Sequence, residues 1–505
     1  ALYNRRFNGM RPRHVDGSYL TTPGIAHGVA LRPHQKDAVA RALRSNEGTL
    51  IAHVVGAGKT FEGVALSHEA KRLGKASKPM LVVPNHLVDQ WAGDESVRRF
   101  WGRVATGDWD AVIVPESRFS QLHVSKERRL RNMRARVDEF AQAVEAAAKA
   151  RGDKDPTVKR LEAARKSAET AMQRLRDGKE SRDDKALAGI EFESLGVDML
   201  IVDEAHHFKN LGVPVASADL GMQLSSAAKC EDLLDKCEWL REAGHGGNIA
   251  FMTGTPVSNS MSELYNMQRY LAPGTLKAQG LDTFAAWAGA YGQVVPTVEL
   301  KPESNGFQVK QRFARFQNLP ELMNAVKQFT DMITNDDIQL PLPELEQVPV
   351  PVPITDRQKK EMKELSDRAD LVRDGDVPPE VDNLLRITGD GRKIALDPKL
   401  LKGHENDRPL ENGKIQACAE NVARIWQEET PRLGTQLVFC DSSTPASGGW
   451  NAYQDLKDRL IQLGVPAEQI AFVHDAGDNP ARREQLFAKV RSGEIRVLMG
   501  STQKL

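Results

Sequence analysis

Short continuous runs of apolar residues recur along the chain, each bounded by turn-forming or charged residues. The first series is separated by stretches long enough for helices and lies at residues 49–55, 79–84, 110–115, 198–204 and 248–254. Strands that are apolar throughout are typical of a parallel sheet with helices on both faces. A second series follows at residues 435–441, 469–475 and 495–501. The pattern predicts an α/β protein with two parallel-sheet domains.

A charged, alanine-rich block over residues 118–190 interrupts the first series. Apolar residues recur at spacings of three and four from Leu130 to Ala147 and, after the break "RGDKDP", again from Val158 to Leu175. We predict an antiparallel helical hairpin inserted into the first domain, with arms of about 35–40 Å. The alternative is a pair of amphipathic helices lying on the sheet.

These patterns divide the chain into consecutive segments. We expect an irregular leader (1–30), a first lobe (31–275) that contains the hairpin, a mixed helical region (276–345), a connector with a helical segment (346–414), and a second lobe (415–505). The connector begins within a proline-rich stretch, 338–358, which is typical of an extended linker.

Composition narrows the class of protein. The 69 Lys and Arg residues balance 69 Asp and Glu residues, so any contact with nucleic acid must come from a local pattern of charge. The four cysteines form no C-x-x-C pair, and no histidine cluster completes a zinc-ligand spacing. No apolar window approaches about 18 residues, and the first residues lack a signal-peptide core. We therefore expect a cytoplasmic protein without a structural metal or a membrane role.

The stretch "HVVGAGKT" follows the first apolar run and precedes a predicted helix. Gly56 and Gly58 allow backbone N–H groups to close around phosphate oxygens, while Lys59 can reach the β- and γ-phosphates and Thr60 can bind Mg²⁺. His53 stands where the pattern G-x-x-x-x-G-K-[ST] has its first glycine. The alternative is a strand-to-helix turn that contains G-K-T by chance.

The stretch "MLIVDEAHHF" places two carboxylates directly after an apolar strand. Asp203 suits Mg²⁺ coordination, and Glu204 suits activation of an attacking water. The alternative is a pair of surface acids at a strand end. Zinc binding by His206 and His207 is disfavoured because adjacent residues of a regular element point to different faces.

These motifs, with "LRPHQ" at 31–35 and "MTGTPVSNSMSELYNMQRYL" at 252–271, resemble the superfamily 2 helicase-type ATPases, and among them the Snf-type DNA translocases. The resemblance spans residues 31–504 and implies two RecA-like lobes, ATP and Mg²⁺ as cofactors, and DNA, favouring duplex, as a partner contacted mainly through its phosphates. It implies that Gln35 contacts adenine beside the loop residues Gly56, Ala57, Gly58, Lys59 and Thr60. It implies coupling roles for His206, Thr253, Gly254 and Thr255. It implies nucleic-acid contacts by Asn85, Gln90, Trp91, Asn259, Ser501 and Thr502.

A narrower resemblance is to large proteins of phages, plasmids and conjugative elements that join a Snf-type helicase module to an adenine-specific DNA methyltransferase. Some of those proteins are associated with defence or anti-restriction, and a histidine at the position of His53 is normal among them. No N-P-P-[YF] signature of such a methyltransferase occurs in these 505 residues. The resemblance implies a methyltransferase or nuclease domain or subunit as a partner.

The sequence ends at "GSTQKL", where the next glycine-rich motif of the family would begin. We therefore expect a second lobe that is incomplete at its C-terminus, and a fragment that binds ATP but hydrolyses it poorly without the family's arginine finger. Two alternatives to a DNA translocase stay open at this point. One is an RNA helicase, and the other is a nucleotide-binding scaffold that docks a nuclease or methylase through the hairpin.

Overall fold

Two compact units divide the chain, Ala1–Thr297 with Lys310–Leu342, and Val298–Val309 with Pro343–Leu505. The structure is a computed structural model. It describes residues 15–26, 28–85, 97–178, 187, 189–213, 226–257, 260–300, 307–338, 343–374, 376–378, 380–404, 406–445, 450–477, 479–502 and 504.

A six-stranded sheet forms the centre of the first unit, with all its strand pairs parallel. Its order is β3-β2-β4-β5-β1-β8. The strands are β1 (Thr49–His53), β2 (Pro79–Val83), β3 (Val112–Pro115), β4 (Met199–Val202), β5 (Ile249–Met252) and β8 (Thr330–Ile333). Because β4, β5 and β1 are neighbours, the loops that follow these three strands meet at one edge of the sheet.

Helices cover both faces of this sheet, as its apolar strands require. Side chains alternate along each strand, so Ile51 and Ile201 pack into the layer of the first two helices, whereas Leu50 and Leu200 pack into the larger core on the other face. The helices are α1 (Pro33–Arg44), α2 (Lys59–Arg72), α4 (Val97–Thr106), α5 (Glu116–Phe119), α9 (Ala228–Glu242), α10 (Ser262–Leu271), α11 (Pro273–Gln279), α12 (Phe284–Tyr291) and α13 (Leu319–Phe329), with 3-10 turns η2 (Phe192–Leu195), η3 (Ala205–Phe208) and η5 (Gly246–Asn248).

The first lobe extends beyond the boundary expected at residue 275. Strand β8, from the region 276–345, hydrogen-bonds in parallel to β1 with Leu50 opposite Thr330 and His53 opposite Ile333. This strand has the sequence "TDMI", whose polar residues conceal it from a search for apolar runs. The same region also holds β6 (Gly292–Leu300) and β7 (Phe307–Phe316), which form a separate two-stranded sheet.

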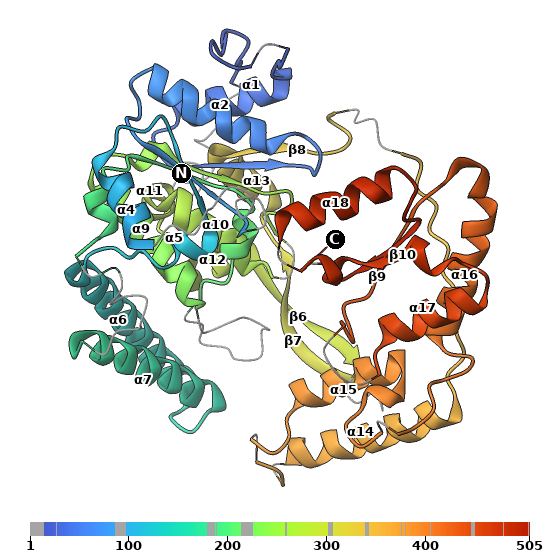
Figure 1. Ribbon diagram of the computed structural model, residues 1–505. Helices are drawn as coiled ribbons and strands as arrows, with labels where there is room; N and C mark the ends of the chain where they lie inside the picture. The colour runs from blue at the N-terminus through green and yellow to red at the C-terminus, as the bar shows by residue number, and fades with distance from the viewer. Residues whose placement is uncertain are drawn as a thin grey trace. The chain divides into compact units, whose positions relative to one another are not determined.

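The inserted block forms two long helices, α6 (Lys126–Arg151) and α7 (Pro156–Arg176), which lie side by side (Figure 1). Ala147, Val158 and Leu161 form the buried seam between them. The Asp155 side chain caps α7 by accepting a hydrogen bond from the Thr157 amide at 2.7 Å. The hairpin expected from the apolar spacing is therefore present between β3 and β4.

The second unit contains a three-stranded parallel sheet of order β10-β11-β9. The strands are β9 (Gln436–Phe439), β10 (Ile470–Phe472) and β11 (Val497–Gly500). Its helices are α14 (Asp356–Asp374), α15 (Leu384–Leu396), α16 (Lys414–Glu428), α17 (Ala452–Gln462) and α18 (Pro480–Arg491), with 3-10 turns η6 (Pro398–Leu400), η7 (Thr430–Arg432), η8 (Ala467–Gln469) and η9 (Val473–Ala476). The expected α/β class with two parallel sheets is confirmed.

Among the described residues, no helix is both long enough and apolar enough to cross a bilayer.

Candidate nucleotide site

The loop between β1 and α2 contains two glycines in the left-handed region of backbone space. Gly56 has φ 87° and Gly58 has φ 92°, a conformation that favours glycine over every other residue. Gly58 also lies against Gln35, because a Cβ added there would be 2.4 Å from Nε2 of that side chain. The "GAG" of the sequence is thus required both by the turn and by a close approach from α1.

The first turn of α2 presents backbone donors at the end of this loop. The amides of Phe61 and Glu62 donate to the Gly58 carbonyl, whereas those of Lys59 and Thr60 have no carbonyl acceptor within the helix. The positive end of the helix dipole lies at the same place. Together with the Thr60 side chain, which is exposed, these groups form a site suited to a phosphate.

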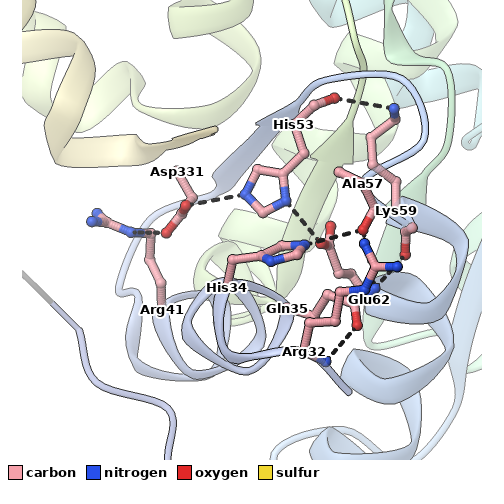
Figure 2. Close-up of polar contacts among 10 residues, drawn as sticks. Arg32, His34, Gln35, Arg41, His53, Ala57, Lys59, Glu62 and Asp331 are labelled. Carbon is pink, nitrogen blue, oxygen red and sulfur yellow. Dashed lines mark hydrogen bonds and ion pairs between the residues drawn. The ribbon is translucent and has the colours of Figure 1, made fainter. Parts of the chain in front are cut away.

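Lys59 lies largely buried beside the loop, with 8% of its surface exposed. Its Nζ donates a hydrogen bond to the backbone carbonyl of His53 at 3.1 Å, as Figure 2 shows. A Cβ added at Gly254, in the loop after β5, would lie 3.5 Å from the same Nζ. The ammonium group is therefore held where the loops after β1 and β5 meet.

The acid pair follows β4, the neighbour of β5. Asp203 is 5% exposed, and its amide donates to the Val82 carbonyl at 2.8 Å. Burial raises the pKa of Asp203, an effect that its hydrogen bond from the Glu204 amide and the charge of Lys59 oppose. Glu204 adopts φ 46°, a left-handed conformation that is unusual outside glycine and that turns the chain sharply away from the strand.

The two histidines after the acid pair make separate contacts. His206 lies 3.1 Å from the Glu204 carboxylate and 3.2 Å from the Thr253 hydroxyl, and this hydroxyl accepts a hydrogen bond from the Thr255 amide at 3.1 Å. Burial and the neighbouring His207 lower the pKa of His206. A continuous set of polar contacts thus joins the acid pair to the "TGTP" loop.

His207 instead pairs with Glu116 at the start of α5, a residue that the sequence analysis did not single out. Lys229 lies 3.4 Å from the same carboxylate, and the pKa of Glu116 is lowered because these two partners outweigh its burial. The only signal available in the sequence was an acid directly after the third strand.

Gln35 braces the loop from α1. Its Nε2 donates to the carbonyls of Ala57 and Gly58, each at 3.2 Å, and its Oε1 accepts from the Arg32 amide at 2.8 Å (Figure 2). The side chain is 5% exposed. The structure therefore assigns Gln35 a contact with the loop, and its contact with adenine stays a prediction.

His53, the residue in place of the first loop glycine, is fully buried between two carboxylates. Nδ1 lies 2.8 Å from Glu62 on α2, and Nε2 lies 3.1 Å from Asp331 on β8, which in turn pairs with Arg41 at 2.9 Å. Figure 2 shows this row of side chains next to the loop between β1 and α2. Burial lowers the pKa of His53, but the two carboxylates outweigh that effect and raise it to about 9.

Ligand atoms of His34, His53 and Glu62 lie within 4.8 Å of one another, close enough in principle to hold a metal ion. However, both ring nitrogens of His53 face carboxylates, and His34 Nε2 lies 3.1 Å from the Ala57 carbonyl. This arrangement favours a protonated imidazole that links β1, α2 and β8 over a metal centre.

The predicted nucleic-acid residues lie in different places. Asn85 is exposed at the end of β2, and its Oδ1 accepts a hydrogen bond from the Ser117 amide at 3.0 Å. Ser501 and Thr502 belong to the second unit, where Thr502 donates to Asp441 from its amide at 2.7 Å and its hydroxyl at 2.8 Å. Gln90, Trp91 and Asn259 lie outside the described residues.

The chemistry of these groups fits a magnesium nucleotide. The free amides at the start of α2 and the Lys59 ammonium suit phosphate oxygens, and the Thr60 hydroxyl and the Asp203 carboxylate are oxygen ligands of the type that Mg²⁺ prefers. The structure brings these groups together with Glu204 and Thr253 at one edge of a single sheet.

Residues 89–334 match the family model described as a probable helicase domain. This match confirms the resemblance to helicase-type proteins that the motifs predict. A curated relative, Defense against restriction protein B of Escherichia phage P1, is 23% identical over 433 residues, which cover 73% of this chain and 19% of the relative. The chain thus spans about a fifth of the length of that relative.

Two solved structures align with most of the chain. The Sulfolobus solfataricus SWI2/SNF2 ATPase core in complex with dsDNA is 14% identical, with a TM-score of 0.34 over 97% of this chain and 80% of that one. The Pyrococcus furiosus Hef helicase domain is 9% identical, with a TM-score of 0.33 over 93% of this chain and 85% of that one.

Proposed function

We propose that the protein is an ATP-dependent DNA translocase motor whose nucleotide site lies at the carboxyl edge of the six-stranded sheet. The observation that carries this proposal is the convergence of three loops, from β1, β4 and β5, which bring the Lys59 ammonium, the acid pair and Thr253 to one edge. Each of these groups matches a task in phosphoryl transfer.

The residues take distinct roles in the proposed reaction. The amides of Lys59 and Thr60 bind phosphate oxygens, while the Lys59 ammonium exchanges the His53 carbonyl for the β- and γ-phosphates. Thr60 and Asp203 hold Mg²⁺, which when bound neutralises charge on the phosphates. Glu204 accepts a proton from the attacking water. Because His206 contacts both the Glu204 carboxylate and the Thr253 hydroxyl, protonation of Glu204 alters the contacts of Thr253.

DNA as the track, and the biological setting, belong to the proposal as well. The helicase-domain match supports movement along a nucleic acid. The name of the phage P1 relative, together with its much greater length, supports a motor that works within a larger DNA-modification, defence or anti-restriction protein. A methyltransferase or nuclease, in the same chain or in another, is the partner that we propose.

Replacement of Lys59 by alanine tests the motor assignment. In the full-length protein, the variant should lose at least 100-fold of its DNA-stimulated ATP turnover, an effect on the order of that seen when a key charged group is removed from a phosphoryl-transfer site. Lys71→Ala is the matched control, because Lys71 lies on the same helix but pairs with Asp108 and Asp110. Unchanged turnover in Lys59→Ala would refute the assignment.

The same assay separates the DNA translocase from an RNA helicase. ATP turnover by the wild-type chain is measured with duplex DNA, single-stranded DNA and RNA. We expect duplex DNA to give the largest stimulation, and a larger stimulation by RNA would replace the DNA translocase with an RNA helicase.

A further inference from the structure

The two helices of the hairpin differ in how their basic residues are used. On α6, Arg128 and Arg131 pair with Glu242 of α9 at 2.8 and 2.9 Å, and Arg136 pairs with Glu231 at 3.1 Å and with Asp235. Asn132 adds hydrogen bonds to Asp235 and Glu238 at 3.0 and 2.8 Å. These contacts attach the base of the hairpin to the first unit.

Most basic residues of α7, in contrast, form no ion pair with another described helix. The helix contains six Lys or Arg residues and two Asp or Glu residues, in a chain whose net charge is zero. Five of these cations make no ion pair with any described residue, and each is exposed: Lys159, Arg160, Lys166, Arg174 and Arg176. Arg176 is the last residue of the helix, and we call the other four residues the basic face of α7.

The spacing of the basic face places its members along one side of the helix. Lys159, Ala163, Lys166, Thr170 and Arg174 follow each other at steps of three and four, and Arg160 flanks this row. The row contains only basic, hydroxyl and alanine side chains. Of the two acids of α7, Glu169 pairs with Arg165 at 3.3 Å, and the exposed Glu162 flanks the row on the side opposite to Arg160. Because Val158, Leu161 and Leu175 occupy the opposite, buried side, α7 presents the basic face outward.

The geometry points to a contact between this face and the phosphate backbone of duplex DNA, and we infer that α7 is a second DNA-binding surface of the protein. The row from Lys159 to Arg174 extends about 22 Å along the helix, enough to follow several phosphates of a groove. The helix contains no aromatic residue, so it lacks the stacking platforms typical of single-strand binders. This inference rests on the DNA-directed function proposed above.

The charge pattern of a helix face distinguishes a surface that binds nucleic acid from one that only contacts solvent. A solvated helix face usually mixes acidic and basic side chains, which pair along the helix. A row of unpaired cations instead costs electrostatic free energy through self-repulsion, and a polyanion relieves it by releasing its counterions. The contact should be insensitive to sequence, since it involves phosphates and no base edge.

The test is a variant of the full 505-residue chain in which all four residues of the basic face become glutamine, a residue with helix propensity close to that of Lys and Arg. Binding of a fluorescein-labelled mixed-sequence DNA duplex is followed by anisotropy between about 50 and 200 mM KCl. We expect at least a tenfold loss of affinity at about 50 mM KCl and a salt slope lower by up to about 4, roughly one for each lost phosphate contact. ATP turnover without DNA should not change.

The matched control removes the same number of positive charges from exposed residues that are paired with acids in the second unit. It carries Lys360→Gln, Arg424→Gln, Lys489→Gln and Arg491→Gln. If both variants bind duplex DNA with the affinity and salt slope of the wild type, the inference is wrong and an acidic protein partner becomes the better occupant. If the wild type binds no DNA at all, the DNA-directed function fails first, and the inference fails with it.

Discussion

The two parallel sheets of the molecule share an architecture but differ at their carboxyl edges. At the edge of the first sheet lie Lys59, the buried carboxylate of Asp203, the neighbouring Glu204 and a helix start with free amides. At the corresponding edge of the second sheet, the end of β9 and the residues after β11 contribute Asp441 and Thr502, which hydrogen-bond to each other. In the described part of the second unit, the α-helices that follow β9 and β10 begin at Ala452 and Pro480, so neither begins at a lysine as α2 does.

The sheets also differ in how fully they are covered. The strands β4 and β5 of the first sheet are buried at every residue. In β9 of the second sheet, Leu437 and Phe439 are 54% and 55% exposed, and they alternate with partly buried residues. The two sheets thus share a frame, and they differ in the side chains and helix starts that the loops after their strands bring to its edge.

Among the substitutions that compare the two sheet edges, Glu204→Gln should have the largest effect on ATP hydrolysis. The amide cannot accept the proton of an attacking water, so phosphate release should fall by about 100-fold or more, while the affinity for ATP stays within a few-fold. The rate of phosphate release and the equilibrium affinity for ATP, both measured on the same preparation, separate the effect on hydrolysis from the effect on binding. Glu127→Gln, an exposed acid of α6, is the control. Hydrolysis within tenfold of the wild type would remove Glu204 from its proposed role.

His53→Gln tests the buried charge network next to the loop between β1 and α2. The folded-state pKa of His53 is about 9, above its ordinary value of 6.5, so the folded protein binds this proton more tightly than the unfolded chain. The stabilisation is therefore complete below about pH 6.5 and is lost as the pH rises through 9. We expect the variant to lose about 3 kcal/mol of unfolding free energy at pH 6.5, and the gap to narrow towards pH 9.5.

Thermal or urea unfolding at several pH values checks this expectation. His68→Gln is the control, since His68 lies on α2 and makes its hydrogen bond to the exposed Pro23 carbonyl. The double variant His53→Gln with Glu62→Gln keeps a neutral pair at the site, so it should recover part of the stability without recovering the pH dependence. A gap between wild type and His53→Gln that is constant from pH 6.5 to 9.5 would show that the imidazole is neutral in the folded protein.

Much of the first lobe could be predicted from local patterns. Strands buried on both faces leave continuous apolar runs, so β1, β2, β4 and β5 lie within a residue or two of their expected positions. The acid pair and the glycine loop were visible because they directly follow such runs.

The missing parts depend on contacts between distant residues. His53 and Asp331 are 278 residues apart in sequence, and β8, which carries Asp331, has too few apolar residues to be recognised. The pairing of His207 with Glu116 and the contact of Gln35 with the loop arise in the same way from the order of strands in the sheet. The order of strands in the sheet leaves no periodic pattern in the sequence. The residues that support the site through contacts between distant segments were therefore harder to predict than the motif residues that form it.

Thr502→Val should have the smallest effect of these substitutions, a modest loss of DNA affinity. It gives the sharpest test of whether the two sheet edges have different roles. The substitution removes the hydroxyl that donates to Asp441 but keeps the backbone hydrogen bond. If Thr502 contacts a DNA phosphate, as the motif implies, the loss of one neutral hydrogen bond should weaken DNA binding by roughly two- to tenfold. ATP affinity and DNA-free turnover should match those of Thr388→Val, which removes an exposed hydroxyl from α15. A loss of ATP turnover as large as that of Glu204→Gln would instead mean that the edge of the second sheet takes part in the chemistry, because a hydroxyl that only touches DNA cannot slow hydrolysis when no DNA is present.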